Sequence, residues 1–195
     1  RYMQTTKMKT LNKKILTSCL ALMMAVAMAV PAFATELSTQ ETVVALAGYN
    51  RYDLGACSLN LYGNSTVYNN QNVNLYTTDQ GSNDQIWLGV PSGKEAGSNK
   101  KNRYVLKIRT SILLGGTPYV LNANMTGSEW NANIKPYDVT NQEIFMGSRG
   151  STNAAEIYLS QHNSYSLLAK GSASGSNVVF SPNYHSNWKV VWQNV

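Results

Sequence analysis

One pattern of short segments occurs three times along the chain, and this repetition restricts the fold more than any other feature. Each copy has four segments rich in Val, Ile, Leu and Tyr, separated by runs of Gly, Asn, Ser and Asp, which is typical of short strands joined by tight turns. The segments span residues 43–46, 58–63, 72–76 and 84–87; 104–108, 119–123, 133–137 and 141–145; and 157–159, 166–169, 177–180 and 188–192. The sequence therefore predicts an all-β domain of three four-strand repeats.

A single repeat of this size cannot bury its apolar face alone, so the three copies must pack on one another. Around a pseudo-threefold axis they can close a barrel and cap one end with hairpins, which leaves no free sheet edge. We expect the aromatic residues that close the repeats, Trp87, Phe145 and Trp192, to meet in a shared core. This architecture is a β-trefoil. The alternative, a β-sandwich of similar length, does not explain the threefold period.

The amino-terminal residues have the composition of an export signal. Basic residues precede an apolar run at residues 15–30, and small residues at 32–34 offer a cleavage site after Ala34. The alternative is a retained membrane anchor, but the apolar run is shorter than the ~20 residues that a comfortable span needs. We therefore predict a cleavable signal peptide over residues 1–34 and a secreted domain over residues 35–195.

The positive charge of the chain belongs largely to this signal. The formal net charge is +6, but five of the sixteen basic residues lie within residues 1–34, so eleven basic residues face ten acidic ones in the domain. The charge therefore does not indicate a nucleic-acid partner. A basic cluster within residues 94–103 is interpreted as part of a solvated loop, because the stretch is rich in Gly, Ser and Asn.

Cys57 is the one cysteine that follows the signal peptide, so the domain cannot form an internal disulfide. Its neighbours Ala56 and Leu59 are apolar, which favours a small buried side chain. The alternative is a disulfide to another molecule.

The segment Asp84-Gln85-Ile86-Trp87 resembles the Gln-x-Trp signature of the ricin-type β-trefoil lectins. Residues 72–76 are similar to the strand that precedes this signature in the family. The same order of elements recurs over residues 43–192, so the resemblance covers most of the predicted domain. It implies a lectin-like protein whose partner is a glycan.

The resemblance also implies a shallow sugar pocket on each repeat. In such a pocket an aromatic ring stacks on the apolar face of the sugar, and planar polar side chains bond to its hydroxyls. On the first repeat the family's pattern falls on Asn60, Asn74, Tyr76, Asp84 and Gln85. The aspartate and asparagine of the pattern are exchanged between Asn60 and Asp84, so a carboxylate, an amide and a ring are all retained.

On the second repeat the family's pattern falls on Asn122, Lys135, Tyr137, Asn141 and Gln142. No carboxylate holds the aspartate position, and one extra residue separates Gln142 from the predicted closing ring. On the third repeat Leu168 and Ser181 occupy the positions of the aspartate and the ring, so no pocket is expected there.

Each predicted site residue also has an alternative structural role. The two glutamines would bond only to backbone, the two tyrosines would be half-buried in strands, and Asn60 and Asn122 would cap turns. These roles are common for amides and tyrosines in β-proteins, so the residue types alone do not decide between the two interpretations.

The domain shows no pattern of catalytic residues. His162 and His185 lie apart in polar segments, and no zinc, nucleophile-elbow or phosphate-loop motif is present in the sequence. The acidic residues are scattered rather than paired as in a glycosidase. We therefore predict a non-catalytic protein without a metal or other cofactor, and without nucleic-acid or membrane partners once the signal is removed.

Two hypotheses for function follow. The first is a secreted carbohydrate-binding protein that uses the first repeat and the second. The second is a β-trefoil that has lost sugar binding and acts through protein contacts, as an inhibitor or as a subunit of a secreted complex. The degenerate third repeat and the insert at residues 91–102 favour the second hypothesis.

Overall fold

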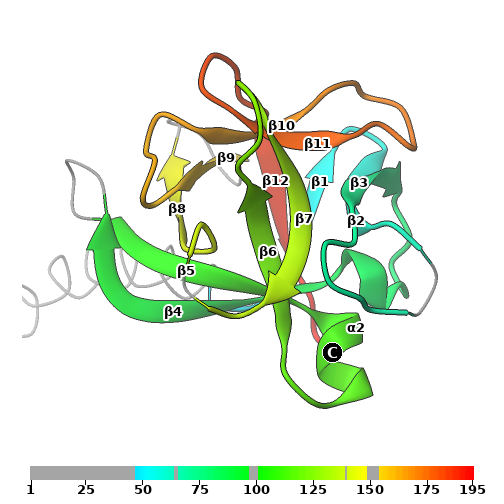
Figure 1. Ribbon diagram of the computed structural model, residues 1–195. Coiled ribbons are helices and arrows are strands. Elements are labelled where there is room, and N and C mark those ends of the chain that lie inside the picture. The colour runs from blue at the N-terminus through cyan, green and yellow to red at the C-terminus, as the bar shows by residue number, and fades with distance from the viewer. Residues whose placement is uncertain (1–46, 64–65, 97–100, 139, 149–153) are drawn as a thin grey trace, which may run out of the picture. The chain divides into compact units, whose positions relative to one another are not determined.

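The structure is a computed structural model, shown in Figure 1, and it describes residues 47–63, 66–96, 101–138, 140–148 and 154–195. The predicted signal peptide and the predicted first strand at residues 43–46 lie outside these residues. Within the described part, no helix is both long enough and apolar enough to cross a membrane.

Twelve strands of the described residues form one antiparallel sheet. The first repeat contains β1 (Gly48–Leu54), β2 (Cys57–Leu61), β3 (Val73–Thr77) and β4 (Trp87–Ala96). The second contains β5 (Lys101–Ile108), β6 (Tyr119–Asn124), β7 (Trp130–Pro136) and β8 (Ile144–Ser148). The third contains β9 (Ala154–Leu159), β10 (Ser166–Ala169), β11 (Val178–Ser181) and β12 (Trp188–Trp192). Two short helices, η1 (Asn83–Gln85) and α2 (Arg109–Leu114), accompany the strands.

The strand pairings repeat three times and close on themselves. β1 pairs with β4 and β12, β5 pairs with β4 and β8, and β9 pairs with β8 and β12, so the first and fourth strands of the repeats form a barrel. The second and third strands form three hairpins, β2–β3, β6–β7 and β10–β11. The described residues therefore contain four strands per repeat, and the first strand among them is β1, Gly48–Leu54.

Cross-strand pairs identify equivalent positions in the three repeats. The corresponding pairs between first and second strands are Asp53–Ser58, Lys107–Val120 and Tyr158–Ser166. The corresponding pairs between second and third strands are Asn60–Asn74, Asn122–Asn133 and Leu168–Val179. These two sets of pairs define which residues of the three repeats are structurally equivalent.

The core is built from these equivalent positions. Side chains alternate between the two faces of a strand, and the inward ones of each repeat meet around the axis. The buried sets are Tyr52, Leu106 and Ile157; Leu59, Leu121 and Leu167; Val73, Ala132 and Val178; and Leu75, Ile134 and Phe180. A threefold set of matching apolar side chains is what the repeated sequence pattern requires.

The residues that close the repeats are Trp87, Ile144 and Trp188, which corrects the predicted set. The indole Nε1 of Trp87 donates to the Leu59 carbonyl oxygen at 3.2 Å. Trp188 makes the same bond to the equivalent leucine in the third repeat, at 3.1 Å. Both indoles are fully buried, as is Ile144, so these three residues occupy the core.

The two other predicted closing residues lie elsewhere. Phe145 is buried but stacks on Tyr158, with ring centroids 5.3 Å apart, on the opposite face of its strand from Ile144. Trp192 ends β12 and is 60% exposed. The prediction failed in the second repeat because isoleucine fills this position, and in the third because the later of two tryptophans in β12 was chosen.

A ring of three asparagines joins the hairpins. Asn72 donates to Asn177 at 3.0 Å, Asn177 to Asn131 at 2.8 Å, and Asn131 back to Asn72 at 2.7 Å. The three residues are equivalent, each lying two positions before the third-strand member of an equivalent pair. Backbone bridges between the hairpins follow the same cycle, so the three repeats are linked at this end by a closed set of contacts.

The basic cluster at residues 94–103 was predicted to lie in a solvated loop, but its described residues, 94–96 and 101–103, belong to the strands β4 and β5. β4 and β5 pair along their length, with an irregularity between Pro91 and Glu95, and the hairpin extends from the barrel at the lower left of Figure 1. Glu143 lies 3.0 Å from Arg103 and 3.5 Å from Lys94, and its side chain is almost fully buried. Lys94 and Arg103 therefore pair with a buried carboxylate.

Cys57 is buried at the start of β2, as the sequence predicts, and is a free thiol. A buried thiol is a poor candidate for the alternative, a disulfide to another molecule.

Candidate functional site

The two faces of the β2–β3 hairpin differ in chemistry. Leu59 and Leu75 are fully buried in the core, so strand alternation places Asn60, Asn74 and Tyr76 on the outer face. The predicted residues of the first repeat that belong to this hairpin therefore do share one face.

The amides on this face are bonded within the fold. The Asn60 side chain donates to the Asn74 Oδ1 at 3.1 Å and to the Leu61 carbonyl oxygen at 2.8 Å. Both residues are buried. The second repeat has the same arrangement, in which Asn122 donates to Asn133 at 2.8 Å. Asn60, Asn74 and Asn122 therefore stabilise hairpins rather than offering open hydrogen-bonding groups.

The two predicted glutamines, Gln85 and Gln142, each hydrogen-bond to the backbone of a loop. Gln85 accepts from the Asp79 backbone at 2.9 Å and donates to the Thr77 carbonyl oxygen at 2.9 Å. Gln142 makes the equivalent pair of bonds to the Asp138 backbone and the Pro136 carbonyl oxygen. Both glutamines are fully buried. Their bonds to backbone atoms agree with the alternative interpretation, in which the glutamines have a structural role.

These bonds correct the predicted alignment of the second repeat. Asn133, rather than the residue two positions later, is the equivalent of Asn74, which makes Lys135 the equivalent of Tyr76. Tyr137 lies two positions beyond Lys135. The distance in sequence from Gln142 to Ile144 equals that from Gln85 to Trp87, so no extra residue is present.

Four predicted residues remain accessible. Tyr76 is 54% exposed and Tyr137 is 41% exposed, while Asp84 and Asn141 are partly buried. The side-chain amide of Asn141 contacts the Met125 sulfur at 2.8 Å. Tyrosine rings and polar groups at the surface are therefore present on both of the repeats for which a pocket was predicted.

Asp84 lines an open hollow of about 350 Å³ beside η1 and α2. Its carboxylate accepts a hydrogen bond from the Thr110 hydroxyl, and Ser82 and Asn83 add further polar groups. The other wall is formed by Leu113 and Leu114, which are both exposed. Tyr76 does not line this hollow, so the first repeat presents the ring and the carboxylate at separate places.

A buried ion pair lies next to these residues and was missed from the sequence. The Arg51 guanidinium donates to both carboxylate oxygens of Asp53, at 2.7 and 2.8 Å, and the Ser58 hydroxyl donates to the same carboxylate at 2.7 Å. The hydrogen bond to Asp53 raises the pKa of Arg51, while burial opposes that rise. The signal in the sequence was the alternation of polar and apolar residues over 51–54, which marks a strand.

The third repeat lacks the amide pair, as expected. Leu168 lies opposite Val179, and Ser181 occupies the position of Tyr76. A buried carboxylate, Glu156, lies 3.3 Å from His185 on this repeat and accepts a hydrogen bond from Tyr158.

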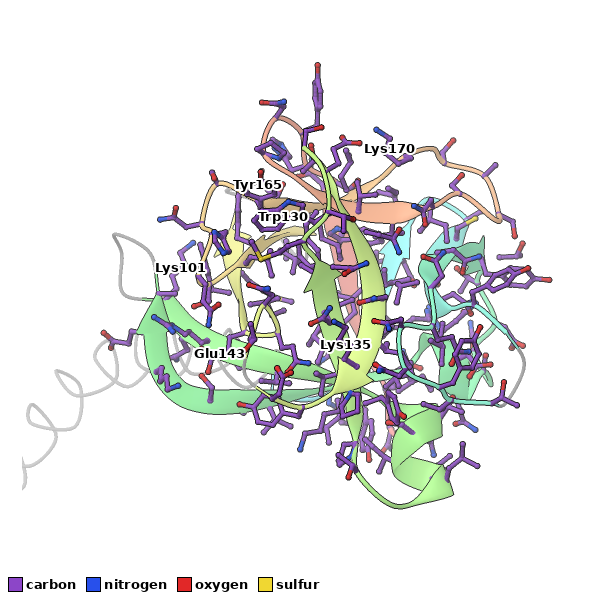
Figure 2. All side chains as sticks on the ribbon, viewed as in Figure 1. Lys101, Trp130, Lys135, Glu143, Tyr165 and Lys170 are labelled. Carbon is purple, nitrogen blue, oxygen red and sulfur yellow. The ribbon has the colours of Figure 1, made fainter. Side chains whose placement is uncertain are left out.

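His162 packs its edge against Trp130, which stacks on Tyr165 with ring centroids 3.8 Å apart (Figure 2). Trp130 and Tyr165 come from the second and third repeats, so the stack is a contact between repeats. Among the described residues, no group of three His, Cys, Asp or Glu side chains is placed to hold a metal ion.

Solved structures similar to this chain share its fold. The designed threefold symmetric protein ThreeFoil matches with 18% identity and a TM-score of 0.58, covering 75% of this chain and 99% of its own. The Rhizoctonia solani agglutinin matches with 18% identity and a TM-score of 0.56, covering 75% of this chain and 96% of its own. A mosquitocidal holotoxin matches with 16% identity and a TM-score of 0.60, covering 76% of this chain but only 17% of the toxin.

ThreeFoil and the agglutinin are β-trefoil proteins, and the chain has the same all-β fold. No protein-family model and no curated protein matches the sequence. At these identities the likeness establishes the fold alone.

Proposed function

We propose that the chain is an exported, non-catalytic carbohydrate-binding protein that holds a glycan between Asp84 of its first repeat and the α2 helix of its second. The observation that carries this proposal is the hollow beside Asp84, which has a polar wall and an apolar wall. A sugar needs both, because its ring has hydroxyls at the rim and C–H groups on the faces. The agglutinin among the structural neighbours and the resemblance to ricin-type lectins support this function.

The chemistry of the hollow assigns a role to each wall. The Asp84 carboxylate accepts hydrogen bonds from sugar hydroxyls, and charge-assisted bonds of this kind are the stronger ones. Leu113 and Leu114 cover the apolar face of the sugar ring. A single open site of this type binds with a Kd of order millimolar, or about −4 kcal/mol, so a repeated glycan is needed for useful avidity.

A glycan array with the unaltered chain and Asp84→Ala tests the proposal. We expect binding to neutral glycans, and a loss of about tenfold or more in the variant, because a hydrogen bond to a charged group contributes ~1.5–3 kcal/mol. Glu129→Gln is the matched control, because this carboxylate lies on another repeat and pairs with Lys170 at the surface. It should bind as the unaltered chain does.

The variant Tyr76→Ala distinguishes binding in the hollow beside Asp84 from binding at the exposed ring that the lectin resemblance predicts. If Tyr76→Ala abolishes binding and Asp84→Ala does not, the glycan uses the exposed ring and the hollow is not the site. Failure of the unaltered chain to bind any glycan would contradict the function itself.

The second candidate function is binding to a protein partner, by a β-trefoil that has lost sugar binding. One observation favours it: five of the predicted sugar contacts are buried, namely Asn60, Asn74, Gln85, Asn122 and Gln142. Purification of the tagged chain from culture supernatant tests this candidate. A stoichiometric partner supports it, and recovery of the chain as a lone monomer counts against it.

A further inference from the structure

The outer faces of the three repeats carry different chemistry at equivalent positions. One row of laterally paired residues crosses four strands in each repeat. The rows are Lys189–Asp53–Ser58–Tyr76, Leu88–Lys107–Val120–Lys135 and Phe145–Tyr158–Ser166–Ser181. The first row has a carboxylate and a ring, the third has two stacked rings and two hydroxyls, and the second has two lysines.

Three differences between the first and second repeats remove negative charge or add positive charge on the second. Lys107 replaces Asp53 and Lys135 replaces Tyr76, as the register of the strands shows. Asn141, which precedes the buried Gln142, stands where the first repeat has Asp84. The second repeat therefore lacks both carboxylates and has two amines at these positions, while Lys189 and Arg51 of the first arrangement are replaced by Leu88 and Val105.

The two lysines share one face of the sheet and lie close together. Leu106, Ile108 and Ile134 are buried in the core, so alternation directs Lys107 and Lys135 to the outer face. They flank Val120 on adjacent strands, which places their Cα atoms roughly 10 Å apart, at two strand spacings. Because a lysine stem carries its ammonium several ångströms from Cα, both ammonium groups can reach a single bound group between them.

Neither ammonium has an acidic partner in the part of the chain that the structure describes. The ion pairs there join Arg51 with Asp53, Lys94 and Arg103 with Glu143, Lys170 with Glu129, and His185 with Glu156. Lys107 and Lys135 are both partly buried, and Figure 2 marks Lys135 on β7. An anionic group placed between the two lysines could accept charge-assisted hydrogen bonds from both ammonium groups.

We propose that the second repeat binds an acidic glycan, with Lys107 and Lys135 together holding its sulfate or carboxylate group. This inference rests on the proposed carbohydrate-binding function and assigns the substrate class of a second, separate site. The exposed Tyr137 lies two residues beyond Lys135 and is placed to contact the sugar that carries the anion.

The charge of the domain favours a single anionic group over a polyanion. Beyond residue 34 the sequence has eleven basic and ten acidic residues, so the domain has no broad positive field to attract a nucleic acid or an anionic membrane. The positive charge on the second repeat is local, and its two lysines match one sulfate or carboxylate.

The test is a glycan array that pairs each sulfated or uronate-bearing glycan with its neutral parent, followed by titration of the best acidic hit. We expect the acidic member to bind more tightly than its parent. Lys107→Ala and Lys135→Ala should each weaken binding by about tenfold, equal to about 1.4 kcal/mol. Lys135→Arg should retain most of the affinity because it keeps the charge. Comparing sulfated with uronate hits identifies which group is preferred.

Lys189→Ala is the matched control, because it removes one exposed lysine from the equivalent row of the first repeat. It should change the affinity less than twofold, in line with the small energies of exposed charges. Circular dichroism of each variant confirms that it is folded. Binding of the acidic hit should also weaken between low and high salt, because exposed charges are screened.

Three results would overturn the inference. The first is that acidic and neutral glycans bind equally tightly. The second is that Lys135→Ala and Lys189→Ala lose the same affinity. The third is that a single-stranded oligonucleotide or phosphatidylserine vesicles bind as tightly as the glycan and depend on the same lysines. The test of the acidic-glycan site can fail independently of the test of the hollow beside Asp84. Asp84→Ala should leave the acidic hit bound, whereas Lys107→Ala should leave neutral hits bound.

Discussion

At the scale of single residues, Tyr52 is the position where one repeat departs from the apolar core of the others. The equivalent residues are Leu106 and Ile157. Tyr52 is fully buried, and its hydroxyl has no hydrogen-bond partner among the described residues. Burial also raises the pKa of this phenol above its usual value. A buried hydroxyl without a partner costs free energy that the other repeats do not lose.

We predict that Tyr52→Phe stabilises the protein by about 1 kcal/mol at neutral pH, because it removes the unpaired hydroxyl and keeps the ring. The difference should grow above about pH 10, where the phenol of the unfolded chain ionises and that of the folded protein does not. The unaltered protein therefore keeps its full free energy of unfolding below about pH 10, and this free energy falls as the pH rises further.

Urea unfolding at pH 7 and pH 10.5 measures both effects. Tyr49→Phe is the control, because Tyr49 is only partly buried. A Tyr52→Phe variant less stable than the unaltered chain would show that the hydroxyl has a partner after all.

Residue-scale reasoning from sequence failed where charged residues are buried in strands. The first strand was predicted at residues 43–46 from its apolar run, whereas β1 is Gly48–Leu54 and contains Arg51 and Asp53. These two residues pair with each other, which makes their burial tolerable. Pairing between side chains two positions apart on one strand face is not visible in composition, so the prediction followed the apolar run and overlooked the alternation over residues 51–54.

At the scale of elements, the β2–β3 and β6–β7 hairpins each contain a buried pair of asparagines, whereas β10–β11 has Leu168 and Val179 instead. The fold therefore accepts either two amides or two apolar side chains at this site. A mixed pair leaves one amide buried without its partner, which costs ~1–3 kcal/mol.

We predict that Asn60→Leu destabilises the protein by about 2 kcal/mol, and that adding Asn74→Val recovers most of this loss. The double variant reproduces the pair that the third repeat uses. Thermal or urea unfolding of the two single variants and the double variant gives the coupling energy. Additive losses would mean that the Asn60–Asn74 bond at 3.1 Å contributes nothing of its own.

The elements of the second and third repeats were largely predictable, because alternation and turn residues mark their strands clearly. The register of the second repeat was not. Lys135 and Ile144 stand where the first repeat has Tyr76 and Trp87, so an alignment guided by aromatic residues moved to Tyr137 and Phe145. The buried bonds of Gln142 fix the register, and only the structure shows them.

At the scale of the whole molecule, three repeats share one core and differ on their outer faces. The core positions match in threefold sets, and the ring of Asn72, Asn131 and Asn177 ties the hairpins together. The repeated frame was predictable because it depends on the spacing of apolar residues. The outer faces were not, because which polar side chains are bonded within the fold depends on register and burial.

The difference between the shared core and the varied outer faces bears on function. The frame leaves each repeat free to change its exposed side chains without cost to the core. The first repeat retains a carboxylate in a hollow, the second presents two lysines, and the third has stacked rings beside a buried carboxylate. We therefore infer separate sites of different specificity on one fold rather than one site copied three times.

Backbone amide shifts in a two-dimensional ¹H–¹⁵N spectrum, recorded while a neutral glycan hit and then an acidic one are added, test this division directly. The neutral glycan should shift the amides of residues 81–84 and 110–114, and the acidic glycan those around Lys107, Val120 and Lys135. If both glycans shift the same amides, or if neither shifts the amides around Asp84, the repeats do not carry the separate sites described here.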